Sequence, residues 1–198
     1  QLSLHPDVDM ISFTGSTRAG IAITKAAADT VKKVALELGG KGANLVFADA
    51  DPAAVARGAR QCFYNSGQSC NAPTRMLVER SFYETAVEQA RKVAEDTPVA
   101  TAHQPGRHIG PVVSKLQWDR IQDLIEKGVN EGARLVAGGP GLPEGVNRGY
   151  YVRPTVFADV NNDMSIARQE IFGPVLSIIP FDSEEEALSI ANDTVYGL

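Results

Sequence analysis

The chain has 198 residues, of which 43% are hydrophobic and 22% charged, so it is long enough to bury a core without cross-links. Its formal net charge is −5 and no block rich in lysine or arginine occurs, which argues against a surface for nucleic acid or for anionic membranes. No run of about 18 apolar residues is present, so no membrane span is expected.

The two cysteines, Cys62 and Cys70, are too few and too close in sequence to form the disulfide framework of a secreted domain. A reducing cytoplasm is therefore the expected compartment. The chain opens on Gln1 without a methionine and closes on the turn-like residues 195–198. We therefore expect it to be a fragment of a longer protein.

The first 38 residues predict one strand–helix–strand unit. A β-rich segment at residues 10–14 leads into a glycine-containing turn at residues 15–20, and a helical pattern follows that turn. Residues 31–38 then have the composition of a second strand. Units of this kind are the repeat from which parallel sheets are built.

A second helix is predicted after a strand at residues 43–48. Asp51 is a favourable N-cap, and Pro52 suits the first helical position. The apolar residues that follow recur at helical spacing on one face, namely Val55, Ala59, Cys62 and Phe63. Cys62 is therefore interpreted as a core residue of this helix.

The rest of the chain continues to alternate between strands and helices. Strands are predicted at residues 76–78, 134–137, 150–156 and 175–181, and helices from Ser81, from Ser114 and over 184–192. The apolar face of the helix from Ser114 should consist of Leu116, Ile121, Leu124, Ile125 and Val129. Gly132 is a favourable stop for that helix. This alternation places the chain in the α/β class.

The turn at residues 15–20 is a candidate phosphate site, because the free N–H groups at the start of a helix attract anions. It follows neither the P-loop pattern nor the GxGxxG fingerprint. A simple strand-to-helix turn remains an alternative interpretation.

Glu37 is a candidate general base. It lies at the end of a predicted strand, and the following Gly39 and Gly40 allow a ligand or another stretch of backbone to approach closely. Partial burial would tune the proton affinity of its carboxylate for base catalysis. The alternative is a surface glutamate before a turn.

Cys70 lies in a polar, glycine-containing loop between a predicted helix and a predicted strand. Such a loop can hold a thiol exposed and reactive, although a lone intracellular cysteine is also often an inert core residue. Farther along, Glu170 and Phe172 lie just before a predicted strand. Two interpretations are open: these side chains line a pocket, or the segment is simply a loop that enters the strand.

No metal site is expected from the sequence. Asp49 and Asp51 could form a ligand pair, but Asp51 is explained as a helix cap. The histidines at positions 5, 103 and 108 form no metal-binding spacing with a carboxylate or a cysteine.

Four segments together resemble the NAD(P)-dependent aldehyde dehydrogenase superfamily. They are Phe-Thr-Gly-Ser-Thr at 13–17, Glu-Leu-Gly-Gly-Lys at 37–41, Asn-Ser-Gly-Gln-Ser-Cys at 65–70 and Glu-Ile-Phe-Gly-Pro-Val at 170–175. The resemblance runs from about residue 8 to the end. It implies a mostly parallel twisted sheet flanked by helices. It also implies that residues 1–37 are the C-terminal remnant of a dinucleotide-binding domain and residues 38–198 a catalytic domain truncated at its C-terminus.

The resemblance assigns roles to the candidate residues. Cys70 matches the catalytic nucleophile that forms a thiohemiacetal and then a thioester, and Glu37 matches the base that activates the deacylating water. The expected cofactor is NAD or NADP. Its matching residues are Gly15 and Ser16 near the nicotinamide and pyrophosphate, Leu38 through its carbonyl, Glu170 at the nicotinamide ribose, and Phe172 at the nicotinamide end. Gln68 and Arg75 match positions that support the loop.

Two alternatives stay open at this level. A relative that transfers the acyl group to coenzyme A is one, although an intact Glu37 favours water as the acceptor. The other is that this chain is a catalytically incompetent folded module, because the family's oxyanion amide and most of its cofactor domain would lie outside it. The resemblance further implies a small-molecule aldehyde substrate and a parent homodimer or homotetramer.

Overall fold

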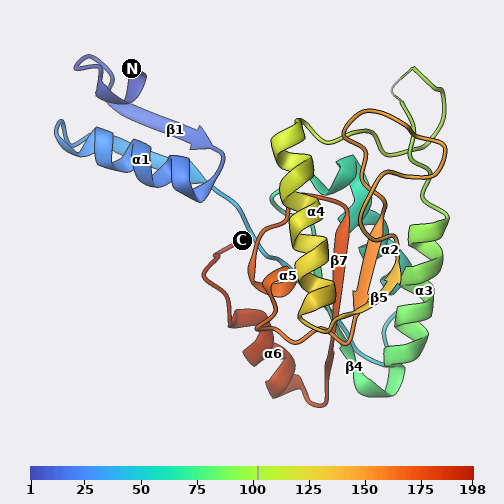
Figure 1. Cartoon of the computed structure of the whole chain (residues 1–198). Helices are drawn as coiled ribbons and strands as arrows, with labels where there is room; N and C mark the ends of the chain where they lie inside the picture. The colour runs from blue at the N-terminus through green and yellow to red at the C-terminus, as the bar shows by residue number, and fades with distance from the viewer. Residues whose placement is uncertain (102) are drawn as a thin grey trace.

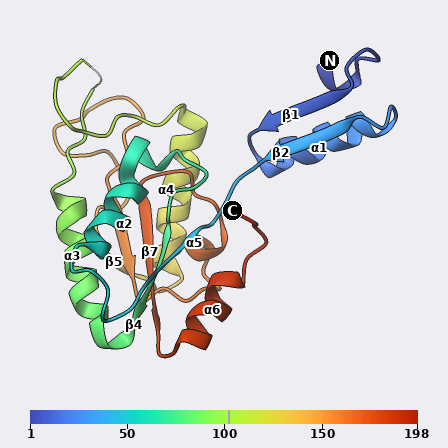
Figure 2. The same cartoon turned by 180° about the vertical axis from the view of Figure 1, so that it is seen from behind.

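The computed structural model describes residues 1–101 and 103–198, and its strands form two separate sheets (Figure 1). The smaller sheet pairs β1 (Met10–Thr14) in parallel with β2 (Lys33–Glu37), and α1 (Thr17–Ala28) connects them. A short 3-10 turn, Leu2–Leu4, precedes this unit. The unit stands apart from the main body in both views, and a single extended segment of the chain connects the two (Figures 1 and 2).

The larger sheet has five strands in the order β3-β4-β7-β6-β5. Their bounds are β3 Ala43–Val46, β4 Arg75–Glu79, β5 Arg134–Ala137, β6 Thr155–Ala158 and β7 Val175–Phe181. All neighbours run parallel except β5, which pairs antiparallel with β6 at one edge. The expected mostly parallel α/β sheet is therefore confirmed.

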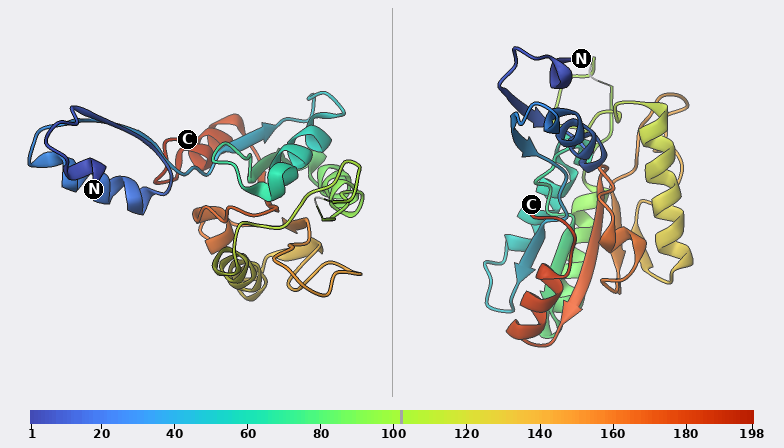
Figure 3. Two further views of the ribbon diagram at one scale, coloured as in Figure 1. Left: turned by 90° about the horizontal axis from the view of Figure 1, so that it is seen from above. Right: turned by 90° about the vertical axis from the view of Figure 1, so that its left-hand side faces the viewer.

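Helices cover both faces of the larger sheet (Figure 3). On one face, α2 (Ala54–Phe63) and α3 (Tyr83–Glu95) pack on the sheet. On the other face lie α4 (Lys115–Asn130), α5 (Ser165–Arg168) and α6 (Glu184–Asn192). Successive side chains of β4 point to opposite faces of the sheet and pack in both layers. Met76 and Val78 face α2 and α3, while Leu77 faces the opposite layer. Strands buried on both faces read as continuous apolar runs.

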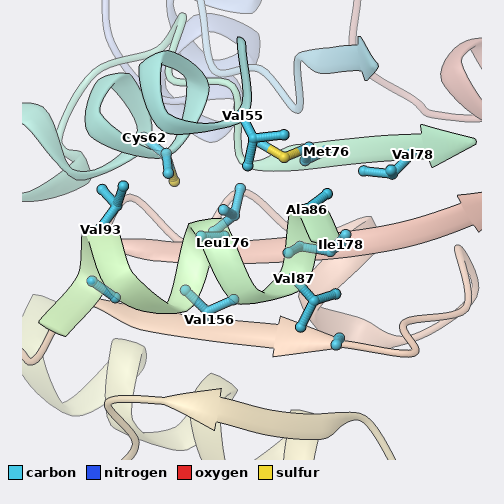
Figure 4. Packing of buried hydrophobic residues seen from close by; sticks show 14 of the residues in the cluster. Val55, Cys62, Met76, Val78, Ala86, Val87, Val93, Val156, Leu176 and Ile178 are labelled. Carbon is cyan, nitrogen blue, oxygen red and sulfur yellow. The ribbon is translucent and has the colours of Figure 1, made fainter. Parts of the chain in front are cut away.

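The predicted apolar face of α2 is confirmed. Val55, Ala59, Cys62 and Phe63 are all buried, and Figure 4 shows Cys62 among core side chains beside Leu176. The predicted start of this helix is wrong by a few residues. The Asp51 carboxylate accepts a hydrogen bond from the Ala53 N–H at 2.8 Å and forms a turn first, so the helix begins only at Ala54.

The α4 helix confirms its predicted ends. The Ser114 hydroxyl accepts a hydrogen bond from the Gln117 N–H at 3.2 Å, and Gly132 follows the helix with φ of 93°. Its predicted apolar face is only partly right, because Leu116 is 81% exposed and Val129 is 44% exposed. The sheet covers only the middle turns, which are the ones that carry the buried Ile121, Leu124 and Ile125.

The strand predicted at residues 150–156 is too long. The structure places β6 at Thr155–Ala158, because Pro154 has no N–H to donate to a neighbouring strand. The strands at residues 10–14, 134–137 and 175–181 and the helix at 184–192 have the predicted bounds. Among the described residues, none of the helices combines the length and apolar character needed to cross a membrane.

Candidate active site

A pocket of about 550 Å³ lies where the two sheets meet. The carboxyl ends of β1 and β2 point toward the segments that precede β3, β4 and β7, three neighbouring strands of the larger sheet. The pocket is lined by Thr14, Gly15, Ser16, Leu38, Gly39, Gln68, Ser69, Cys70, Asn71, Gln117, Arg120, Glu170 and Phe172. Every residue predicted for the site lines this pocket except Glu37.

Cys70 is a free, half-buried thiol on the loop that precedes β4. The loop begins with a 3-10 turn, Tyr64–Gly67, in which Asn65, Ser66 and Gly67 have φ of 51°, 56° and 71°. Left-handed conformations cost a non-glycine residue about 1 kcal/mol or more each, so neighbouring contacts must hold this turn. One such contact is the Ser66 hydroxyl, which donates to the Gly110 carbonyl at 2.7 Å.

Gly67 allows the loop to touch the segment before β7. A Cβ at this position would overlap the Gly173 carbonyl and approach the Pro174 nitrogen to 2.7 Å. Both neighbours are backbone atoms that cannot rotate away. Glycine is therefore required here for two reasons, the left-handed φ and the lack of space.

The backbone N–H of Cys70 has no hydrogen-bond partner among the described residues. Residues on either side of it are engaged, because the Ala72 N–H donates to the Ser69 carbonyl at 3.1 Å and the Gln68 N–H donates to the Asn65 carbonyl at 3.1 Å. Cys70 thus sits inside a turn with an unused donor at the pocket. Such a donor can stabilise an oxyanion that forms on a carbonyl attacked by the thiolate.

Gly39 and Gly40 bring the Glu170 carboxylate and the Cys70 loop together. A Cβ on Gly39 would overlap the Glu170 carboxylate, and a Cβ on Gly40 would lie 2.8 Å from the Cys70 carbonyl oxygen. The Gly40 N–H donates to Glu170 Oε1 at 3.4 Å. The prediction that these glycines permit close approach is therefore confirmed.

Phe172 is a bulky residue in the left-handed region, with φ of 55°. Two carbonyls of this segment, those of Ile171 and Phe172, each accept a hydrogen bond from Gln117 Nε2 at 2.9 Å. Arg120 Nη2 donates to the Glu170 carbonyl at 2.9 Å. The start of α4 therefore holds the pocket wall formed by residues 170–172.

Gly15 and Ser16 join β1 to α1 at the opposite wall. The Gly15 N–H donates to the Glu37 carbonyl at 3.0 Å, and the Ser16 hydroxyl accepts a hydrogen bond from the Ala19 N–H at 3.3 Å. The Glu37 side chain is exposed, so the expectation of partial burial is wrong for the described chain. Glu37 is the last residue of β2, at the end of a two-stranded sheet.

Two buried cations lie behind the pocket. Lys41 is 1% exposed, and its Nζ has no hydrogen-bond partner among the described residues. Burial, with a smaller opposing effect from nearby Cys62, lowers the pKa of Lys41 to about 7. Arg75 donates to the carbonyls of Lys41, Ile190 and Ala191 at 2.9 to 3.0 Å, so it joins the site to the end of α6.

The two thiols have different environments. Cys62 Sγ is fully buried and donates to the Val175 carbonyl at 3.5 Å. Burial is the main cause that raises the pKa of Cys62 to about 12, which keeps it a thiol at neutral pH. Cys70 is therefore the cysteine that is placed for nucleophilic chemistry.

A protein-family model described as the aldehyde dehydrogenase family matches residues 1–198. The chain belongs to this family. It is 51% identical over all 198 residues to 3-succinoylsemialdehyde-pyridine dehydrogenase of a Pseudomonas species, and it spans 42% of that protein.

Solved aldehyde dehydrogenase structures share the fold. The enzyme of Bartonella henselae is 66% identical with a TM-score of 0.98, over 99% of this chain and 41% of that one. A cysteine-to-alanine mutant of aldehyde dehydrogenase C from Pseudomonas syringae, in complex with NAD+ and octanal, is 49% identical with a TM-score of 0.97, over 100% of this chain and 41% of that one. The chain spans about two fifths of the relatives it matches.

Two pocket residues of this aldehyde dehydrogenase chain escaped sequence reasoning. Gln117 and Arg120 line the pocket and support residues 170–172, yet no motif marks them. The Ser114 cap was the available signal, because it predicts a helix start whose first turns carry both side chains.

Proposed function

We propose that this chain carries the catalytic cysteine of an enzyme that oxidises an aldehyde to a carboxylic acid with NAD(P)+. The observation that supports this most is the pocket itself. It joins Cys70, whose backbone N–H has no partner among the described residues, to Glu170 and to the Gly15–Ser16 turn from the other sheet. The Pseudomonas syringae relative, which was solved with NAD+ and octanal, supports the same reaction class.

The residues at the pocket fit a dinucleotide. Gly15 and Ser16 precede a helix of 12 residues, whose N-terminal N–H groups favour a phosphate. Gly39 leaves the Glu170 carboxylate against bare backbone, where it can accept hydrogen bonds from ribose hydroxyls. Leu38 and Phe172 would complete the nicotinamide end. When bound, NAD(P)+ supplies the acceptor for the hydride.

Cys70 would act first. Its thiolate sulfur forms a bond to the aldehyde carbon, and the carbonyl oxygen becomes an oxyanion that the Cys70 N–H stabilises. Loss of hydride from that carbon restores the C=O bond and leaves a thioester on Cys70. Glu37 would then take a proton from water as the water oxygen attacks the thioester, and the C–S bond breaks to release the acid and the thiolate.

Substitution of Cys70 by alanine in the longer enzyme tests this proposal. We expect aldehyde-dependent NADH formation to fall by at least about 10³-fold, because no second thiol lines the pocket. Cys62→Ala is the matched control and should retain activity, since its thiol is buried in the core. Normal aldehyde oxidation by the Cys70→Ala enzyme would contradict the proposal.

Coenzyme A acylation is the second candidate reaction. A free thiol would then replace water as the acyl acceptor, and Glu37 would have no water to activate. We propose hydrolysis, because a carboxylate at position 37 suits it. NADH production that requires added coenzyme A would favour the alternative.

We further propose that residues 1–37 belong to the cofactor domain, residues 38–198 to the catalytic domain, and the whole enzyme to the cytoplasm as a homodimer or homotetramer. The division follows the two sheets. The 198 residues alone should bind NAD(P)+ weakly and show no dehydrogenase turnover, since they span two fifths of the relatives. Calorimetry that gives micromolar affinity for this chain would overturn that expectation.

A further inference from the structure

Every polar group of Gln68, two positions before Cys70, is engaged in a hydrogen bond. Its Nε2 donates to the Asn65 carbonyl at 3.1 Å, and its Oε1 accepts from the Val113 N–H at 2.9 Å. Its own carbonyl accepts from Asn65 Nδ2 at 3.0 Å, and its N–H donates to the Asn65 carbonyl. Gln68 therefore fixes both its own peptide and the left-handed turn that delivers Cys70.

The Val113 end of this contact belongs to the start of α4. Val113 immediately precedes the Ser114 cap, and one turn later Gln117 donates to the carbonyls of Ile171 and Phe172. One helix terminus therefore holds the cysteine loop on one side and the Glu170–Phe172 wall on the other. The side chains of Gln68 and Gln117 both line the pocket between them.

We propose that Gln68 is a positioning residue that fixes the direction of the Cys70 thiol and N–H relative to the Glu170–Phe172 wall through its contact with Val113. This inference rests on the proposed function, because that wall is assigned to the nicotinamide. Reaction within a bound complex depends steeply on alignment, and a misplacement of about 1 Å can reduce the rate about 100-fold.

The role is distinct from that of the other loop contacts. Ser66 also bonds to the segment before α4, through Gly110, but it lies before Gly67, and its hydroxyl makes no hydrogen bond to residues 68–70 among the described residues. Loss of the Ser66 hydroxyl should therefore lower stability without redirecting the thiol. Loss of the Gln68 side-chain amide should redirect the thiol even where the fold survives.

The test uses Gln68→Met, which keeps the length of the side chain and removes its hydrogen bonds. Single-turnover hydride transfer in the longer enzyme should fall about 10- to 100-fold, while the Kd for NAD+ changes by less than about two-fold. Alkylation of Cys70 by iodoacetamide in the 198-residue chain should be unchanged or faster, because that reagent needs access and not alignment. Ser66→Ala, which removes a different contact of the same turn, should lower the free energy of unfolding and slow hydride transfer less than Gln68→Met does.

A second pair of variants addresses the Val113 contact alone. Val113→Pro removes the N–H that donates to Gln68 Oε1, and Val113→Ala keeps it. Val113 is 79% exposed, so loss of its side chain should cost little in packing. Val113→Pro should slow transfer in the same direction as Gln68→Met, which also loses the bond to the Asn65 carbonyl. The double variant should be no slower than Gln68→Met alone, since the contact with Val113 is already lost there.

Two results would overturn the role of Gln68. One is a transfer rate in Gln68→Met within about three-fold of the wild type. The other is a fall in alkylation by the same factor as transfer, which would show an effect on the reactivity of the thiol and not on its direction. A wild-type enzyme without NAD(P)-dependent aldehyde oxidation would instead refute the proposed function.

Discussion

Cys62 and Cys70 show, at the scale of single residues, how surroundings decide what a thiol can do. Both occur within one short stretch of sequence, and neither is paired. Helical spacing alone predicted that Cys62 belongs to the core, and its burial confirms this. No such pattern applied to Cys70, whose loop position allowed either interpretation. The family resemblance made it the expected nucleophile, and the structure places it at a pocket.

The two thiols should differ sharply in reactivity. At pH 8, iodoacetamide should modify Cys70 in the folded 198-residue chain and leave Cys62 unmodified, because burial holds the pKa of Cys62 near 12. Peptide mass spectrometry checks this, with Cys70→Ala as the control that should remain unlabelled. Rapid modification of Cys62 under folded conditions would show that its helix opens easily.

At the scale of elements, the strands and helices were predictable wherever the signal is local. Alternation and composition predicted β1 and β7, and a hydroxyl cap predicted the start of α4. One error has a local cause that was overlooked, because Pro154 lacks an N–H and shortens β6. Another arises where a distant partner decides, as when the sheet leaves Leu116 uncovered. The contacts of Gln117 with residues 171 and 172 are of this second kind, and for that reason the sequence did not reveal them.

The contact of Gly67 in the cysteine loop with the segment before β7 gives a prediction at this scale. Gly67→Ala should lower the free energy of unfolding by about 2 to 4 kcal/mol, because the new methyl group would meet the Gly173 carbonyl at a left-handed φ.

Gly145→Ala is the matched control. Gly145 also has positive φ, at 75°, but no atom of the described residues lies within 4 Å of a Cβ there, so only the backbone strain of about 1 to 2 kcal/mol should appear. Denaturant unfolding of the two variants measures both values. If the two variants lose equal free energy of unfolding, the steric overlap with Gly173 adds no cost to the backbone strain at Gly67.

At the scale of the whole molecule, the site exists because the carboxyl ends of the strands in the smaller sheet face the amino ends of strands in the larger sheet. The carboxyl ends of β1 and β2 meet segments that precede β3, β4 and β7, so residues from four motif-bearing stretches line one pocket, and the start of α4 adds a fifth stretch. Sequence motifs identified the first four stretches through the resemblance to a family. Composition and periodicity could not, since neither encodes which strand ends become neighbours.

Buried Lys41 makes stability depend on pH. Its pKa falls from 10.5 in the unfolded chain to about 7 in the folded protein, so the unfolded state binds more protons between these values. Below about pH 7, Lys41 is charged in both states, and the folded state carries the whole cost of burying that charge. The free energy of unfolding should therefore rise as the pH increases from about 7 toward 10.5.

Comparison with Lys41→Met isolates this effect from other titrating groups. The variant should be more stable at pH 7, by about 1 to 4 kcal/mol, and the difference from the wild type should shrink as the pH approaches 10. Urea unfolding at several pH values measures it. A difference that stays constant with pH would show that Lys41 finds a partner for its charge in the folded state.

The central claim is that Cys70 carries the acyl group and that Glu37 directs water to release it. Mass spectrometry of the Glu37→Gln longer enzyme, mixed with aldehyde and NAD(P)+, tests this most directly. We predict one burst of NADH per active site, slow turnover afterwards, and an acyl adduct on the peptide that contains Cys70. Full turnover without an adduct, or an adduct on another residue, would contradict the account.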